Sequence, residues 1–182
     1  MTAKISPWPD ILPPVLPTPC FVVDEARLLA NLEILDAVQR RTGAKILLAL
    51  KGFAMFSTFP LLREVLHGAC ASSPHEARLA REEFGREVHT FAAAYSEEDM
   101  REILLVSDHV VFNSFAQLER FTPLLRAAEK EQGRSIEIGL RVNPEHSEGA
   151  VPIYDPCSPG SRLGIRLAAF AGRTPEELTA LG

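Results

Sequence analysis

The chain has 182 residues, a formal net charge of -5 and a pI near 5.6. It is long enough for one domain with a hydrophobic core, and it lacks the basic excess that binding to phosphate backbones requires, so neither nucleic acid nor a membrane surface is an expected partner. No uncharged apolar run approaches the roughly 20 residues that span a bilayer. Three widely separated cysteines, Cys20, Cys70 and Cys157, favour reduced thiols and a cytoplasmic protein.

The first 19 residues are rich in proline, which prevents regular helix or strand hydrogen bonding. We therefore expect an extended arm over 1–19, followed by a folded domain over 20–182. Within that domain, Cys20–Val23 predicts a short strand. A helix is then expected, beginning after a cap at Asp24 and ending at Gly43, because leucines recur between them at helical spacing.

Residues 44–50, AKILLAL, are almost continuously apolar, which is typical of a parallel strand that is buried on both faces. Four further strands are expected, over 68–72, 88–93, 109–112 and 136–142. Helices are expected between them, because Ser73, Ser96 and Ser114 each begin a helix-capping pattern. Residues Thr174 and Pro175 begin another such pattern, so the chain is expected to end inside a structural unit.

This alternation predicts an α/β fold with parallel strands, because each strand needs a crossover helix to return the chain to the same edge. The residues alone leave two architectures open, a doubly wound sheet and a (β/α)8 barrel. No G-x-G-x-x-G motif follows the first strand, which argues against a dinucleotide-binding version of the doubly wound sheet.

Lys51 directly follows the expected strand over 44–50. Parallel α/β folds place their sites at the carboxyl ends of the strands, and partial burial there would lower the pKa of the lysine and make its amine available to a carbonyl carbon. In the alternative interpretation, its aliphatic stem covers the strand end while the ammonium group reaches water. Position alone leaves both interpretations open.

Several segments, in order, resemble one enzyme family. These segments are KILLALKGFAMFSTFPLL, ASSPHEARLA, VFNSFAQLERF, GLRVNPEHSE and YDPCSPGSRLGI. They are similar to carboxynorspermidine/carboxyspermidine decarboxylases, which are alanine-racemase-like, fold-type III enzymes. The resemblance implies a partial (β/α)8 barrel, truncated after about five to six βα units. It also implies pyridoxal 5'-phosphate as cofactor, a polyamine-type substrate, decarboxylation to norspermidine or spermidine in polyamine biosynthesis, and a homodimer.

The same resemblance implies roles for particular residues. Lys51 would hold the cofactor as a Schiff base, and Arg141 and Glu76 would lie beside the cofactor. Arg141 would alternatively form an ordinary ion pair at a strand end, and a helix-capping box accounts equally well for Glu76. The loop residues His146, Tyr154 and Asp155 are candidates for substrate binding, although His146 also suits a solvated loop. No histidine or cysteine spacing predicts a metal site.

The resemblance also implies parts that lie beyond Gly182, among them a phosphate cradle, a ring-stacking histidine and a β-rich domain. A chain ending there is expected to bind the cofactor poorly and to have no activity alone. Three alternatives stay open: another fold-type III decarboxylase or racemase, a barrel that binds pyridoxal phosphate without catalysis, and an inactive remnant.

Overall fold

The computed structural model describes residues 19–149, 151 and 154–180. The arm predicted over 1–19 lies outside these residues except for Pro19. The chain forms two compact units, one ending at Ala44 and the other beginning at Lys45. Among the described residues, the first unit contains helix α1 (Glu25–Thr42), with Asp24 as its amino-terminal cap and Gly43 in a left-handed conformation at its end, as predicted.

The strand predicted over Cys20–Val23 is wrong. These residues have no regular secondary structure, and Phe21 is 98% exposed. A strand is stable only when its backbone groups pair with a neighbouring strand, and a short apolar run carries no information about whether a neighbour exists.

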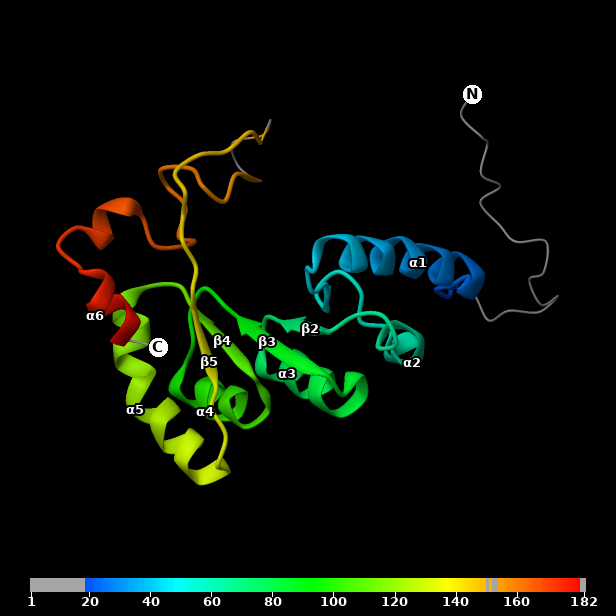
Figure 1. Ribbon diagram of the computed structural model, residues 1–182, viewed down its shortest axis with the longest axis horizontal. Coiled ribbons are helices and arrows are strands. Elements are labelled where there is room, and N and C mark those ends of the chain that lie inside the picture. The colour runs from blue at the N-terminus through cyan, green and yellow to red at the C-terminus, as the bar shows by residue number, and fades with distance from the viewer. Residues whose placement is uncertain (1–18, 150, 152–153, 181–182) are drawn as a thin grey trace. The chain divides into compact units, whose positions relative to one another are not determined.

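The second unit is built around a parallel sheet with the order β1-β2-β3-β4-β5 (Figure 1). Its strands are β1 (Leu47–Ala49), β2 (Gly68–Ala71), β3 (Glu87–Phe91), β4 (His109–Phe112) and β5 (Glu137–Leu140). The five strands predicted from Ala44 onwards are present, most of them shorter than predicted. Every crossover steps in the same direction, whereas a doubly wound sheet reverses direction at its switch point. The architecture is therefore α/β with a partial barrel, and the barrel alternative is confirmed.

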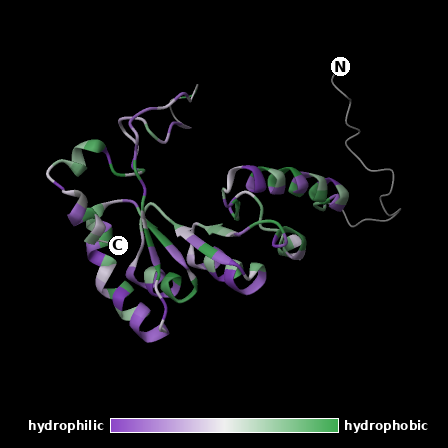
Figure 2. Cartoon of the chain, in the orientation of Figure 1, coloured by the Kyte–Doolittle hydropathy of each residue, from purple (hydrophilic) through white to green (hydrophobic). Residues whose placement is uncertain are grey.

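Helices cover one face of this sheet. In Figure 1, α3, α4 and α5 lie along the same side of the strands, and Figure 2 shows that these helices carry both hydrophobic and hydrophilic residues. The helical elements of the unit are η1 (Phe56–Thr58), α2 (Phe59–Leu62), α3 (Pro74–Leu79), the π-helical turn η2 (Ala80–Phe84), α4 (Glu97–Val106), α5 (Phe115–Gln132), η4 (Leu167–Phe170) and α6 (Pro175–Ala180). No helix of the described residues is long and apolar enough to cross a bilayer.

The predicted capping residues begin these helices. Ser96 caps α4 in a complete capping box with Asp99. Ser114 caps α5, but the reciprocal bond differs from a capping box, because the Oε1 of Gln117 accepts the N–H of Asn113, the residue before the cap. The side chain thereby joins the end of β4 to the first turn of α5.

Burial alternates along the strands. Val88, Thr90, Val110 and Phe112 are fully buried, whereas the residues between them are half-buried. The helix-facing side packs against residues of α4 and α5 in one core cluster. The opposite side is the one that faces the interior in a closed barrel. The prediction that strand 44–50 is buried on both faces is wrong, since Ala49 is exposed and the described residues cover only one face fully.

Candidate active site

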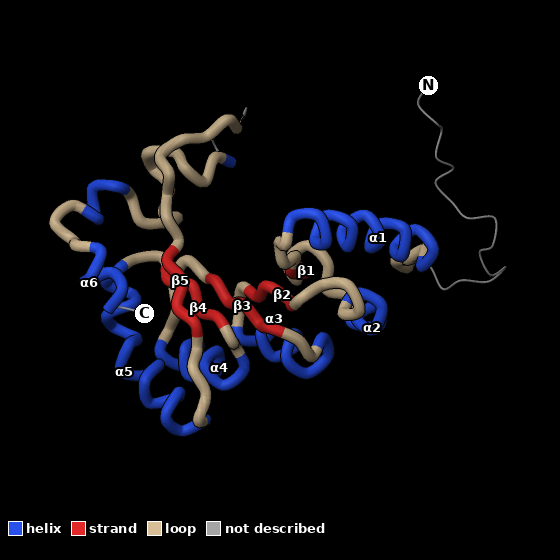
Figure 3. Tube along the Cα trace, in the orientation of Figure 1, coloured by secondary structure: helices blue, strands red, loops and turns tan. Residues whose placement is uncertain are grey.

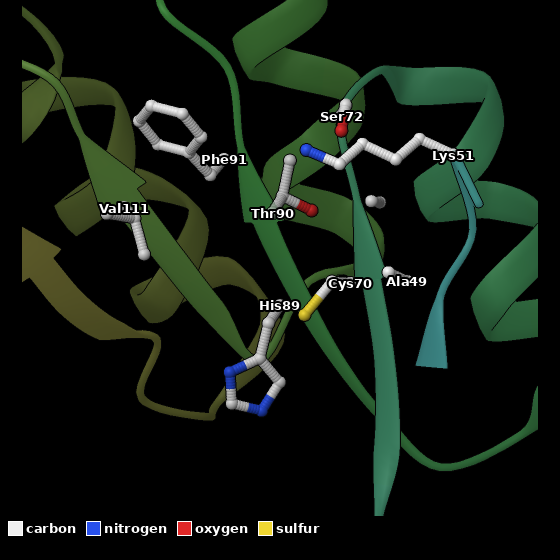
Figure 4. A pocket seen from close by; sticks show the side chains of 9 residues that line it. Ala49, Lys51, Cys70, Ser72, His89, Thr90, Phe91 and Val111 are labelled. Carbon is white, nitrogen blue, oxygen red and sulfur yellow. The ribbon is translucent and has the colours of Figure 1, made fainter. Parts of the chain in front are cut away.

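A pocket of about 240 Å³ lies on the half-buried face of the sheet, towards the carboxyl ends of the strands (Figure 4). Its lining residues are Ala49, Lys51, Cys70, Ala71, Ser72, His89, Thr90, Phe91 and Val111. They come from the ends of β1 to β4 and from the residues that follow β1 and β2. Four adjacent strands therefore shape one hollow, as the sequence predicted for the position of a site.

Lys51 stands in a tight turn directly after β1. The N–H groups of Gly52 and Phe53 both donate to the carbonyl oxygen of Ala49, at 2.9 and 3.1 Å, while the N–H of Leu50 still pairs with the carbonyl of Cys70. This turn holds the backbone of Lys51 at the strand end, and the side chain extends into the pocket (Figure 4).

Lys51 is exposed, so the partial burial expected for it is not found. The reason is that the pocket opens onto the sheet face opposite α3, α4 and α5, which no described helix of the second unit covers. Cys70, which lines the same pocket, is half-buried; burial raises the pKa of its thiol, and the nearby Lys51 ammonium partly opposes this rise. The thiol therefore favours its neutral form and packs as a small apolar group.

Arg141 lies beside this pocket. Its N–H donates to the carbonyl of Phe112 at 2.9 Å, which fixes it directly after β5. Its guanidinium carbon is 4.7 Å from the centre of the Phe91 ring, a cation–π distance, and Phe91 forms part of the pocket wall. Arg141 therefore contacts one wall residue of the Lys51 pocket, although it is not itself among the lining residues.

Glu76 lies in the first turn of α3 and forms only half of the capping box that was one of its two interpretations. Ser73 caps α3 by accepting the N–H of Glu76 at 3.2 Å, and the Oε2 of Glu76 accepts the N–H of Ser72 at 2.6 Å. The reciprocal bond goes to the residue before the cap, as in α5. Because Ser72 lines the pocket, the bond from its N–H to Glu76 helps to fix that part of the pocket wall.

The three loop candidates lie apart from the Lys51 pocket. The His146 side chain is 75% exposed, with Nε2 3.7 Å from a Glu148 carboxylate oxygen, as in the solvated-loop interpretation. Tyr154 and Asp155 line a different hollow, formed by residues 154–163, and Asp155 accepts the N–H of Cys157 at 2.8 Å. None of the three lines the Lys51 pocket in the described structure.

Two asparagines that the sequence analysis did not single out fasten the loop over 154–165. The side chain of Asn113 donates to the carbonyl of Arg162 at 2.8 Å and accepts the N–H of Gly164 at 2.7 Å. The N–H of Asn143 donates to the carbonyl of Ile165 at 2.8 Å. Figure 3 draws the described residues between β5 and α6 mostly as loop, and these bonds join that segment to the residues that follow β4 and β5. Asn113 directly follows β4, and Asn143 directly follows the strand predicted over 136–142; this position was the available signal.

The fold, a partial parallel barrel with Lys51 in the turn after β1, is similar to that of alanine-racemase-like decarboxylases. Diaminopimelate decarboxylase from Helicobacter pylori has this fold, with a TM-score of 0.60 over 76% of this chain and 36% of that one, at 18% identity. The crystal structure of carboxynorspermidine decarboxylase from Campylobacter jejuni matches more closely, with a TM-score of 0.71 and 36% identity over 87% of this chain and 38% of that one.

Curated sequence relatives show what the chain resembles. A carboxynorspermidine/carboxyspermidine decarboxylase from Campylobacter jejuni is 40% identical over 153 residues, covering 84% of this chain and 38% of that protein. A carboxyaminopropylagmatine decarboxylase from Synechocystis sp. is 44% identical over 164 residues, covering 90% of this chain and 41% of that protein. The resemblance to carboxynorspermidine/carboxyspermidine decarboxylases is confirmed in both sequence and fold. The chain spans about two fifths of the length of the curated relatives it matches. No protein-family model matches it.

Proposed function

We propose that the intact protein carrying this chain is a pyridoxal-phosphate-dependent carboxy-lyase of polyamine biosynthesis. It removes carbon dioxide from carboxynorspermidine or carboxyspermidine and leaves norspermidine or spermidine. The observation that carries this proposal is the Lys51 side chain, which extends into the pocket at the carboxyl ends of β1 to β4. Residues 20–182 supply the amino-terminal part of the cofactor-binding barrel, and the intact protein acts as a cytoplasmic homodimer.

The residues of the pocket fit the cofactor. Lys51 presents an amine that reaches an aldehyde carbon from the strand end, and the pocket beside it is open and bounded by the flat ring of Phe91. The Arg141 guanidinium lies at the same wall and has donors for a phenolic or phosphate oxygen. When bound, pyridoxal phosphate supplies an electron sink for the electron pair released as carbon dioxide departs.

The chain's own residues then have distinct tasks. Lys51 would hold the cofactor through its amine, and the same Nζ would be able to carry a proton. The positive charge of Arg141 offsets negative charge at its end of the pocket. The bond between Glu76 and the Ser72 backbone keeps the pocket wall in register with the start of α3.

The two relatives named above differ in the substrate for which they are named. The relative at 44% identity is named for carboxyaminopropylagmatine, which suggests that a carboxylated guanidine-bearing substrate is the second candidate. Both kinds of substrate, the carboxylated polyamines and carboxyaminopropylagmatine, would present a carboxylate and an amine to the Lys51 pocket. Comparison of kcat/KM for carboxynorspermidine, carboxyspermidine and carboxyaminopropylagmatine with the intact protein separates them; a preference of tenfold or more for the last would replace our first assignment.

Borohydride reduction followed by peptide mass spectrometry tests the role of Lys51. We expect the intact, cofactor-loaded protein to carry the pyridoxyl mass on the peptide that contains Lys51. Lys51→Arg should lose both this label and measurable decarboxylation, because arginine keeps the charge but not the nucleophilic amine. The matched control Lys130→Arg, on the exposed side of α5, should keep both. A label on any other lysine would overturn the proposal.

A further inference from the structure

A second group of polar side chains stands on the same sheet face as the Lys51 pocket and is not used by the proposed reaction. The register pairs His89 with His109 across β3 and β4, and Glu87 precedes His89 by two residues, so all three side chains point to the same side. Figure 4 shows the His89 ring at the end of the pocket away from the Lys51 amine. Chain spacing hides this group, because its two histidines come from different strands.

The three side chains are close enough to bind one ion together. The Oε2 of Glu87 lies 3.2 Å from the Nε2 of His89 and 3.9 Å from the Nε2 of His109. One donor atom from each residue lies within 4.8 Å of the others, and all three side chains are half-buried. The other carboxylate oxygen of Glu87 is held by the Lys45 ammonium at 3.2 Å, which orients Oε2 towards the imidazoles.

We propose that Glu87, His89 and His109 form a binding site for a divalent transition metal ion of the zinc class, with water in the remaining position. Two imidazoles and one carboxylate are a ligand set that such ions prefer over magnesium or calcium. The site goes beyond the proposed decarboxylation and does not depend on it, because neither Lys51 nor the cofactor contributes a ligand.

Metal binding requires a defined rearrangement of these side chains, which has a recognisable signature. In a tetrahedral site with ligand distances of about 2.0 to 2.1 Å, neighbouring donor atoms are about 3.3 Å apart. The Glu87–His89 edge already has this length, and the Glu87–His109 edge must contract by about half an ångström. The imidazole rings are stacked with centroids 3.8 Å apart and planes 10° from parallel, so their lone pairs run side by side. Metal binding must therefore turn one ring out of the stack.

Cobalt and zinc titrations of the intact protein, after treatment with a chelator, test the site. We expect one Zn²⁺ per chain by calorimetry, and Co²⁺ should give the visible absorption bands of a tetrahedral nitrogen–oxygen site. Binding should raise the Tm, because the ion joins β3 to β4 and binds only the folded state. In nuclear magnetic resonance spectra, the ring protons of His89 and His109 should shift as the stack opens.

His89→Gln and His109→Gln should each weaken Zn²⁺ binding at least tenfold, while His75→Gln, at an exposed histidine of α3, should leave it unchanged. Glu87→Gln provides a third test with a nearly isosteric side chain. Lys51→Ala should bind Zn²⁺ as the wild type does, so failure of the metal site and failure of the lyase assignment give different results. The absence of stoichiometric binding, or equal binding by both histidine variants and the wild type, would overturn the proposal.

Discussion

Tyr95 offers a quantitative test of how the rim of the pocket is held. Its side chain is 6% exposed, and its hydroxyl accepts the N–H of Ala92 at 2.9 Å and donates to the carbonyl of Val111 at 2.9 Å. It thus ties the carboxyl end of β3 to that of β4. Tyr95→Phe keeps the ring and removes both bonds, leaving a backbone donor and a backbone acceptor without this partner. We expect the free energy of unfolding to fall by about 2 kcal/mol.

The destabilisation caused by Tyr95→Phe should also depend on pH, and the size of this dependence can be predicted separately. Burial raises the pKa of Tyr95 from its ordinary value of 10.0 to about 12. The folded state therefore retains the hydroxyl proton at pH values where the unfolded state has released it. The protonated Tyr95 hydroxyl therefore contributes its full stabilisation to the folded state below pH 10, and this contribution is lost as the pH rises through 12. At pH 11 the free energy of unfolding has fallen by about 1.4 kcal/mol for this reason.

Tyr95→Phe has no proton to lose at this position. The gap in unfolding free energy between wild type and variant should therefore shrink by about 1.4 kcal/mol between pH 8 and pH 11. Urea unfolding followed by circular dichroism at both pH values measures it. Tyr154→Phe, at the chain's other tyrosine, is the matched control, because that side chain is 82% exposed and should show neither effect. A Tyr95→Phe gap that is constant with pH would refute the reasoning.

Two further substitutions test other parts of the unit. The hydroxyls of Thr90 and Ser107 are fully buried and 2.7 Å apart. Thr90→Val should therefore lower the free energy of unfolding by about 1 to 3 kcal/mol in denaturant titrations. The double variant with Ser107→Ala should lose less than the sum of the two single losses, because the two hydroxyls are each other's partner. Gly164 has φ +84° and would place a Cβ 2.7 Å from the backbone nitrogen of Asn143, so Gly164→Ala should destabilise by more than about 1 kcal/mol and speed proteolysis of the 154–165 loop, whereas Gly160→Ala, with open space around it, should not.

Local signals in the sequence predicted the elements well because their causes are local. A serine cap with an acidic or amide residue three positions later satisfies orphan N–H groups within a few residues, so Ser96 and Ser114 marked the starts of α4 and α5 correctly. The bond from Gln117 to the N–H before the cap was not predicted, since it depends on the angle at which β4 enters the helix.

Features that depend on pairing between strands were not predictable in the same way. The strand over Cys20–Val23 was wrong because its existence depends on a neighbour. The contact between His89 and His109 was missed for the same reason, since it follows from the register of β3 and β4. Lys51 was correctly placed at a strand end, because an apolar run followed by a turn is a local pattern, whereas its exposure depends on what covers the sheet face.

Because side chains alternate along each strand, most core residues lie on the helix side of the sheet and most polar side chains of the proposed sites lie on the opposite side. On β3, Val88 and Thr90 are fully buried on the helix side, although Thr90 also borders the pocket, whereas Glu87, His89 and Phe91 face the open side and belong to the proposed metal site or the pocket. A slip of one residue in the pairing of β3 would exchange these two sets and bury two titratable side chains against the helices without partners. The cost of that exchange strongly favours the native register, so the apolar helix-facing residues are what hold the polar side chains of the opposite face in place.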